Sequence, residues 1–204
     1  MKKQDILKEI VLDEYGECEH SKITKEQLRL EPQLFSEVER MYKELGGTNV
    51  DDFPIRYGSW DISTRDFIIE LDEENHFNRY RLLTLKSDIY QQIKGFPIND
   101  YRKYCENYES SCVKFGKYWK TDSTEKLFIK SDINGKLDGS GSSRWRQRAF
   151  YDYLKDFTGI ITGIPVIRIS IYQNFEGMLV KDILNKKDKK VISDLVHNSI
   201  NKWL

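Results

Sequence analysis

The sequence predicts a mixed α/β domain, and three patterns along the chain lead to that prediction. Apolar residues recur at helical spacing through residues 25–45. Two short extended segments, 53–62 and 66–72, are joined by a polar turn, which is typical of a β-hairpin. A run of mostly β-branched residues over 166–171 follows Pro165 and is typical of a buried strand. Because helical and strand patterns alternate along 204 residues, we expect one domain whose sheet is flanked by helices.

Helical patterns account for most of the remaining chain. Pro32 interrupts the 25–45 pattern and predicts a kink or a helix start at that point. A polar, glycine-containing stretch over 121–143 predicts a hairpin turn and a flexible loop, after which Ser143 can cap a helix. The other expected helices span 2–13, 79–93, 99–115, 144–157 and 188–203.

Composition narrows the class of protein. The chain is 39% hydrophobic and 13% aromatic, which is enough apolar material to form a core. No apolar run approaches the ~20 residues that span a bilayer, and the charged N-terminus does not resemble a signal peptide. Cys18, Cys105 and Cys112 form no CxxC pair, which fits reduced thiols. We therefore expect a cytoplasmic protein that makes no contact with a membrane.

The formal net charge is zero, but the two parts of the chain differ in sign. Residues 1–74 carry 10 basic and 19 acidic side chains, whereas residues 75–204 carry 23 and 14. The basic part could face a polyanion such as DNA. Alternatively, the two parts pack against each other and their charges cancel.

Three carboxylates of the predicted hairpin suggest a metal site. Glu70 and Asp72 alternate with apolar residues and therefore project from one face of a strand, and Asp61 on the preceding strand can lie beside Glu70. Clustered carboxylates repel each other unless a cation compensates them, so removing one should cost little stability. Carboxylate oxygens suit Mg²⁺ or Mn²⁺. The alternative is a solvated acidic strand end, because Asp72 begins the charge run Asp72-Glu73-Glu74.

The stretch Ile69–His76 resembles the E-x-D-x-x-x-H signature of the very-short-patch-repair-like branch of the PD-(D/E)XK nuclease superfamily. In that branch an Asp lies on the first hairpin strand, and a helix with Arg and Asp and a strand with Arg follow the signature. The same order is present here over residues 57–77 and 144–171. The matching residues are Asp61, Glu70, Asp72 and His76 around the hairpin, Arg148 and Asp152 in the helix, and Arg168 in the last strand.

The resemblance implies a restriction-endonuclease-like mixed sheet and a divalent-metal-dependent hydrolase that cuts DNA phosphodiester bonds and leaves a 5′-phosphate, in defence or repair. It places Mg²⁺ or Mn²⁺ at Asp61, Glu70 and Asp72, with His76, Arg148 and Arg168 as further catalytic residues. DNA is the implied partner, and a homodimer is one option. Two alternatives are a nuclease-fold module that has lost activity and binds nucleic acid or a protein, and a metal phosphoesterase for nucleotides.

Two features depart from the superfamily's pattern. Asp72 stands where a lysine is usual, so the positive charge must come from elsewhere. Residues 77–143 separate His76 from the matching helix and predict an inserted helical region that extends the cleft. The predicted domain therefore spans residues 1–204, with N-terminal helices in 1–47 and this insertion.

Basic and aromatic residues supply the remaining candidates. Arg79, Arg81 and Arg144 are predicted contacts to DNA phosphates, although Arg79 and Arg81 could instead pair with nearby acidic residues. Arg148 could pair with Asp152 within its helix. The insertion mixes residues that could stack bases or form an ordinary helical core: Tyr101, Arg102, Lys103, Tyr104, Tyr108, Lys114, Phe115, Lys117, Tyr118, Trp119 and Lys120.

Overall fold

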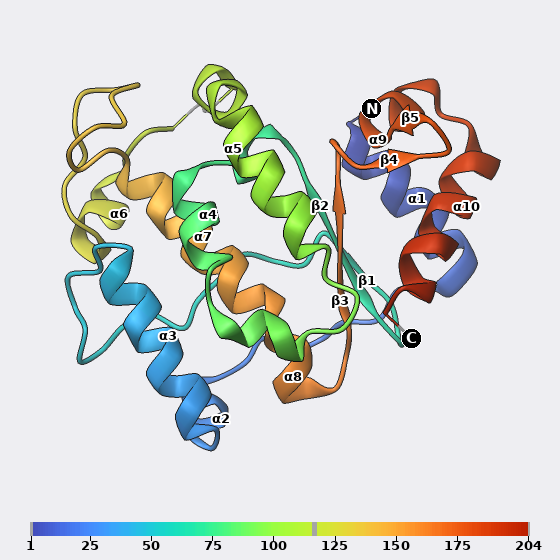
Figure 1. Ribbon diagram of the computed structural model, residues 1–204. Coiled ribbons are helices and arrows are strands. Elements are labelled where there is room, and N and C mark those ends of the chain that lie inside the picture. The colour runs from blue at the N-terminus through green and yellow to red at the C-terminus, as the bar shows by residue number, and fades with distance from the viewer. Residues whose placement is uncertain (1, 116–117, 204) are drawn as a thin grey trace.

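The computed structural model describes residues 2–115 and 118–203 and shows a mixed α/β fold that is mostly helical (Figure 1). Its central sheet has three strands in the order β1 (Ile62–Ser63), β2 (Ile68–Asp72) and β3 (Val166–Ser170). A separate two-stranded sheet pairs β4 (Asn174–Phe175) with β5 (Met178–Leu179). The prediction of a mixed sheet accompanied by helices is confirmed at this level.

The middle strand, β2, determines which side chains meet in the sheet. It runs antiparallel to β1 and parallel to β3, and its Glu70 lies in register with Arg168. The predicted proximity of these three segments is confirmed. The predicted first strand, 53–62, is wrong in length, because only its last residue belongs to β1. Pro54 in that segment has no N–H with which to continue a hydrogen-bonded ladder.

Helices cover the central sheet on both sides (Figure 1). On one side lie α2 (Lys25–Arg29), α3 (Pro32–Glu44), α4 (Arg79–Thr84), α5 (Ile98–Phe115), α6 (Asp122–Leu127), α7 (Ser143–Asp156) and α8 (Thr158–Thr162). On the other side lie α1 (Lys3–Tyr15), α9 (Val180–Lys186) and α10 (Lys189–Asn201). Two 3-10 helices, η1 (Glu74–His76) and η2 (Asp88–Gln92), lie before and after α4 in the chain. None of the helices in the described residues is long and apolar enough to cross a bilayer.

Several helix boundaries differ from those predicted. The 25–45 pattern contains two helices, and α3 begins at Pro32, because proline is well tolerated at the first helical position. The expected helix over 79–93 is divided into α4 and η2. Ser142 caps α7 in place of Ser143, since its hydroxyl accepts a hydrogen bond from a backbone N–H in the first turn. The helix α9 and the β4–β5 hairpin were not predicted.

The helix α7 lies in the interior and carries both apolar and charged side chains. Of its 14 residues, 11 are buried. Phe150 and Leu154 pack in the hydrophobic core together with the following Phe157. Lys155 and Asp156 are buried as well, on the side of the helix that contacts the sheet. Because these charges have no contact with bulk water, they need partners inside the protein.

Two buried arginines provide such partners. The guanidinium of Arg168, on β3, donates to Asp72 at 2.7 Å and to Asp156 at 2.8 Å. Asp156 also accepts a hydrogen bond from Arg81, on α4, at 2.6 Å. Charged groups are tolerated in a protein interior when they are paired and hydrogen-bonded in this way. Through Arg81, this network connects the predicted insertion to the sheet and to α7.

The acidic first part of the chain and its basic second part meet in ion pairs. Glu70 contacts Lys155 in the interior at 2.6 Å, and Glu9 contacts Lys189 at the surface at 2.9 Å. This arrangement agrees with the alternative in which the two parts pack together and their charges cancel.

Replacing Asp156 by alanine should destabilise the fold by about 3–5 kcal/mol, because two buried guanidiniums would lose a shared carboxylate. Chemical denaturation measures the change in the free energy of unfolding. Asp194→Ala is the control, since its pair with Lys190 is exposed and its loss should leave the midpoint unchanged. Equal effects of the two substitutions would contradict the importance of the buried network.

Candidate metal centre

Alternation along β2 determines which side chains face α7. Glu70 and Asp72 are buried on the face that α7 covers, while Ile69 and Leu71 point to the opposite face. Parallel pairing with β3 places Arg168 beside Glu70 on the same face. A charged layer therefore lies between the sheet and α7.

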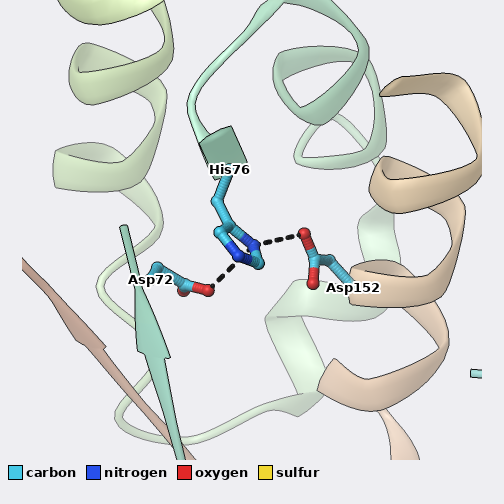
Figure 2. A group of neighbouring side chains, drawn as sticks. All are labelled: Asp72, His76 and Asp152. Carbon is cyan, nitrogen blue, oxygen red and sulfur yellow. Dashed lines mark hydrogen bonds and ion pairs between the residues drawn. The ribbon is translucent and has the colours of Figure 1, made fainter. Parts of the chain in front are cut away.

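Three possible metal ligands meet at one end of this layer. Figure 2 shows the ring of His76 between the carboxylates of Asp72 and Asp152. Its Nδ1 lies 2.8 Å from Asp152 Oδ2 and 3.2 Å from Asp72 Oδ1. One ligand atom of each residue lies within 4.8 Å of the others, so the group could hold a metal ion. Both carboxylates are buried, whereas the His76 side chain is 23% exposed, so the group is open to solvent at His76.

His76 and Asp152 form a charged pair. Burial acts to lower the pKa of His76, but the carboxylates of Asp152 and Asp72 outweigh it and raise this pKa. Burial acts to raise the pKa of Asp152, but His76 and Arg168 hold it well below its usual range. A cation that binds here must displace the proton on Nδ1, so metal binding will be coupled to proton release.

Asp61 lies beside Glu70, as the hairpin predicted. Oδ2 of Asp61 accepts a hydrogen bond from the backbone N–H of Leu71 at 2.9 Å, and Oδ1 accepts one from Gln4 at 2.9 Å. The backbone N–H of Asp61 donates to Glu70 Oε1 at 3.1 Å. Burial raises the pKa of Asp61, and the nearby negative charge of Asp72 adds to this effect. Asp61, Glu70 and Asp72 therefore belong to one charged cluster.

A lysine from α7 supplies positive charge at this cluster. Lys155 Nζ donates to Glu70 Oε2 at 2.6 Å and to the carbonyl of Ser59 at 2.8 Å, and it lies 5.3 Å from the centre of the Trp60 ring. Burial nevertheless raises the pKa of Glu70 to about 7. Glu70 can therefore exchange a proton near neutral pH. The positive charges beside the carboxylates of β2 thus come from Lys155 on α7 and Arg168 on β3.

The structure corrects the expectation that the clustered carboxylates lack a counter-charge. Asp72 Oδ1 contacts Arg168, and Asp72 Oδ2 accepts a hydrogen bond from Tyr101 at 2.7 Å. Glu70 is paired with Lys155. Removing Asp72 would thus take a partner from a buried guanidinium, and we expect a larger stability cost for this residue than the sequence suggested.

The donor set of the three-residue group fits a divalent cation. It offers two carboxylate oxygens and one imidazole nitrogen, and these are common ligands of first-row divalent ions. Against this, Arg168 donates to the same Asp72 oxygen that lies near His76. That positive charge weakens the attraction of the site for a cation.

The predicted DNA contacts have different environments. Arg81 is 1% exposed and held by Asp156, so its prediction as a DNA contact is wrong. Arg79 pairs with Glu109 at 2.8 Å rather than with the acidic residues that precede it. Arg144 is half-buried and bonds to the side chain of Gln147. The roles of Arg79 and Arg144 in binding DNA stay predictions.

Arg148 and Arg168 lie on different sides of the cluster. Arg148 donates to the carbonyl of Asn75 at 3.3 Å, next to His76, and makes no ion pair with Asp152. Arg168 is fully buried and contacts Asp72 and Asp152, so it supports these carboxylates and does not face a DNA strand at the surface. Arg148 remains close enough to His76 for its charge to lower that residue's pKa.

The predicted insertion forms part of the protein interior near the cluster. Tyr101 bonds to Asp72, and Trp119 is buried against Trp145. Among the aromatic candidates, Phe115 and Tyr118 are exposed; Lys117 lies outside the described residues. The expectation that this region extends a cleft stays a prediction, whereas its contribution to the core is evident.

Three functional candidates have roles that the sequence did not assign. Asp152 was predicted to match the helix of the signature, with a pair to Arg148 as the alternative, and its carboxylate contacts His76. Lys155 and Tyr101 contact the carboxylates of β2. One feature of the sequence does point to Asp152 and Lys155. Both are charged, they lie about one turn apart on an interior helix, and such residues need partners on the sheet.

In EDTA, the free energy of unfolding should fall as the pH rises from about 5 to 8. The folded-state pKa values of Glu70, about 7, and of His76, also raised, exceed the ordinary values of 4.5 and 6.5. The stability they contribute is therefore fully present below the ordinary pKa and is lost as the pH rises through the folded-state pKa. For Glu70 the shift corresponds to about 3 kcal/mol.

Urea unfolding across this pH range checks the prediction. Glu70→Gln should remove or reverse most of the change in the free energy of unfolding with pH. Glutamine keeps the shape of the glutamate side chain but cannot titrate. Glu109→Gln is the control and should retain the slope, because the pKa of Glu109 is lowered by Arg79. A wild-type free energy of unfolding that stays constant over this range would contradict the raised pKa values.

Mn²⁺ should raise the melting temperature of the wild-type protein, because an ion that binds only the folded state stabilises it. Asp152→Asn should reduce this shift more than Asp61→Asn, since Asp152 belongs to the group whose ligand atoms lie within 4.8 Å of one another. Differential scanning fluorimetry with a Mn²⁺ titration measures both. The opposite order would favour the donor set Asp61, Glu70 and Asp72.

No curated protein and no solved structure matches this chain, and the resemblance to PD-(D/E)XK nucleases stays a prediction. A family model described as Family of unknown function (DUF7255) matches residues 40–186, which include β1, β2, β3 and α7. Since the match covers well over half of the sequence, the chain belongs to the DUF7255 family.

Proposed function

We propose that the protein is a divalent-metal-dependent nuclease that hydrolyses phosphodiester bonds of DNA. The observation that carries the proposal is the meeting of Asp61, Glu70 and Asp72 with His76, Asp152 and Lys155 between the sheet and α7. Acidic ligands beside a cation of the protein are the combination that stabilises charge during displacement at phosphorus. We further propose that the sheet, with its hairpin, parallel third strand and covering helix, is of the restriction-endonuclease-like type.

Asp72 is the ligand common to both possible donor sets. The ion would rest on Asp72 together with His76 and Asp152, or with Asp61 and Glu70. A mixed set with an imidazole takes Mn²⁺ more readily than Mg²⁺, which binds oxygen almost exclusively. When bound, the ion would supply charge neutralisation and a lower pKa for a coordinated water.

Residues of the chain provide the remaining chemistry. Glu70, with a pKa of about 7, can accept the proton of the attacking water near neutral pH. Lys155 holds the Glu70 carboxyl in place. Arg148, half-buried beside His76, can donate to a phosphate oxygen of the DNA backbone and help to hold the strand at the centre. The product that the nuclease resemblance implies is a 5′-phosphate end.

The second candidate function is a nuclease-fold module that binds nucleic acid or a protein without cutting. One observation favours it: both oxygens of Asp72 already have partners in Arg168 and Tyr101, and Glu70 has Lys155. A fully paired network can be retained for stability alone. Cleavage by the purified protein separates the two functions.

Asp61→Asn, Glu70→Gln and Asp72→Asn should each lower DNA cleavage with Mn²⁺ by about a hundred-fold or more, because each removes a charge from the centre. These substitutions keep the hydrogen-bonding oxygen, so the melting temperature should change far less than in the alanine variants. Cleavage of plasmid and of labelled single strands measures the activity. Asp66→Asn, an exposed acid in the same hairpin, is the control and should retain it.

Two results would count against the nuclease. Wild-type protein that binds Mn²⁺ and cuts no nucleic acid would favour the binding module. Variants that lose activity only in proportion to the unfolded fraction would show that these carboxylates are structural partners of Arg168 and Lys155.

A further inference from the structure

The only residues of α7 that are not buried form a single row. They are Arg144, Arg148 and Tyr151, at positions i, i+4 and i+7, and the other residues of the helix are buried. Residues at this spacing share one face of a helix. The next position along the row is Lys155, which contacts Glu70 in the candidate metal centre. The row therefore leads from the surface to the site.

The two arginines of this row have many unused hydrogen-bond donors. A guanidinium carries five N–H donors. Arg144 uses its side chain to bond to Gln147, and Arg148 bonds to the carbonyl of Asn75 at 3.3 Å. Within the described parts of the chain neither forms an ion pair, whereas Arg79, Arg81 and Arg168 all do.

The closeness of Arg144 and Arg148 is unfavourable in the free protein, because both side chains are positively charged. Like charges one helical turn apart repel each other, and both guanidiniums are half-buried. Burial and the charge of Arg148 lower the pKa of Arg144. Exposed Arg56 adds a further positive charge near Tyr151, and this charge acts to lower the pKa of the Tyr151 hydroxyl. An anion between these groups would relieve the repulsion and use the free donors.

We propose that Arg144, Arg148 and Tyr151 bind successive non-scissile phosphates of a DNA strand, so that the substrate is a polynucleotide rather than a free nucleotide. The proposal rests on the proposed function for the position of the scissile phosphate at the metal centre. Four residues of helix correspond to a rise of about 6 Å, which places each arginine of the row one nucleotide step farther along an extended strand. A mononucleotide bound at the centre would leave the row unused.

Gln147 and Tyr151 complete this site. Gln147 Nε2 donates to the hydroxyl of Tyr151 at 3.2 Å, which leaves the tyrosine proton free to donate to a phosphate oxygen. The oxygen of the same Gln147 amide accepts a hydrogen bond from Arg144 and orients its guanidinium. The row thus presents oriented donors, as expected for contact with the backbone of a nucleic acid.

The test is DNA binding in EDTA, which needs no catalysis. Fluorescence anisotropy with a labelled single-stranded 12-mer would be followed over a series of salt concentrations. The double variant Arg144→Gln/Arg148→Gln should bind about ten-fold more weakly, with a salt slope smaller by about 1.4, because each lost phosphate contact on a single strand contributes about 0.7. Its melting temperature should be unchanged or higher, since the repulsion is removed.

Lys86→Gln/Lys94→Gln is the matched control, because it removes two charges from exposed positions of the described surface. It should change the affinity and the salt slope less than the arginine variant does. Competition by thymidine monophosphate should be equally weak for the wild type and the arginine variant.

Three results would each overturn the phosphate site. They are equal losses of DNA affinity in the two double variants, an unchanged affinity in the arginine variant, and a wild type that binds no DNA. A wild type that binds through these arginines and cuts nothing would overturn the nuclease and leave the phosphate site intact. A wild type that cuts DNA, with an arginine variant of unaltered affinity, would overturn the phosphate site alone.

Discussion

The buried guanidinium of Arg168 holds the centre of the fold together. It contacts Asp72 on β2 and the side chains of Asp152 and Asp156 on α7. One charged group thereby fixes the distance between the sheet and the helix that covers it. The cost of burying this charge is offset only while its partners remain in place. The geometry of the candidate metal centre therefore depends on a side chain that does not itself reach solvent.

This arrangement has two opposite effects on a metal ion. Fixed carboxylates are pre-organised, so an ion would bind without further ordering of the ligands. The same cations that fix them compete with the ion, since Arg168 and the proton on His76 both contact Asp72. Affinity for metal should consequently depend on whether a bound ion can replace the His76 proton, and it should increase as the pH rises.

The sequence predicted those parts of the site that depend on local spacing. Strand alternation placed Glu70 and Asp72 on one face, and the hairpin placed Asp61 beside them. The roles of Asp152 and Lys155 depend on how α7 is rotated against the sheet, which no local pattern determines. The burial of Arg81 depends on Asp156, 75 residues farther along the chain. The first strand was predicted too long, because an apolar stretch resembles a strand whether or not a neighbour offers it hydrogen bonds.

The elements around the centre differ in how far they cover it. The sheet closes one side, and Tyr101 and Arg81 of the predicted insertion close another through their contacts with Asp72 and Asp156. The edge of His76 is exposed, the row on α7 is half-exposed, and Asp61 lines a pocket together with Trp60 and His20. A phosphate chain lying along that row would meet partly desolvated arginines before it reached His76, and contacts of this kind are stronger than those at a fully exposed surface. The direction of the helix would then determine the direction in which a bound strand runs through the site.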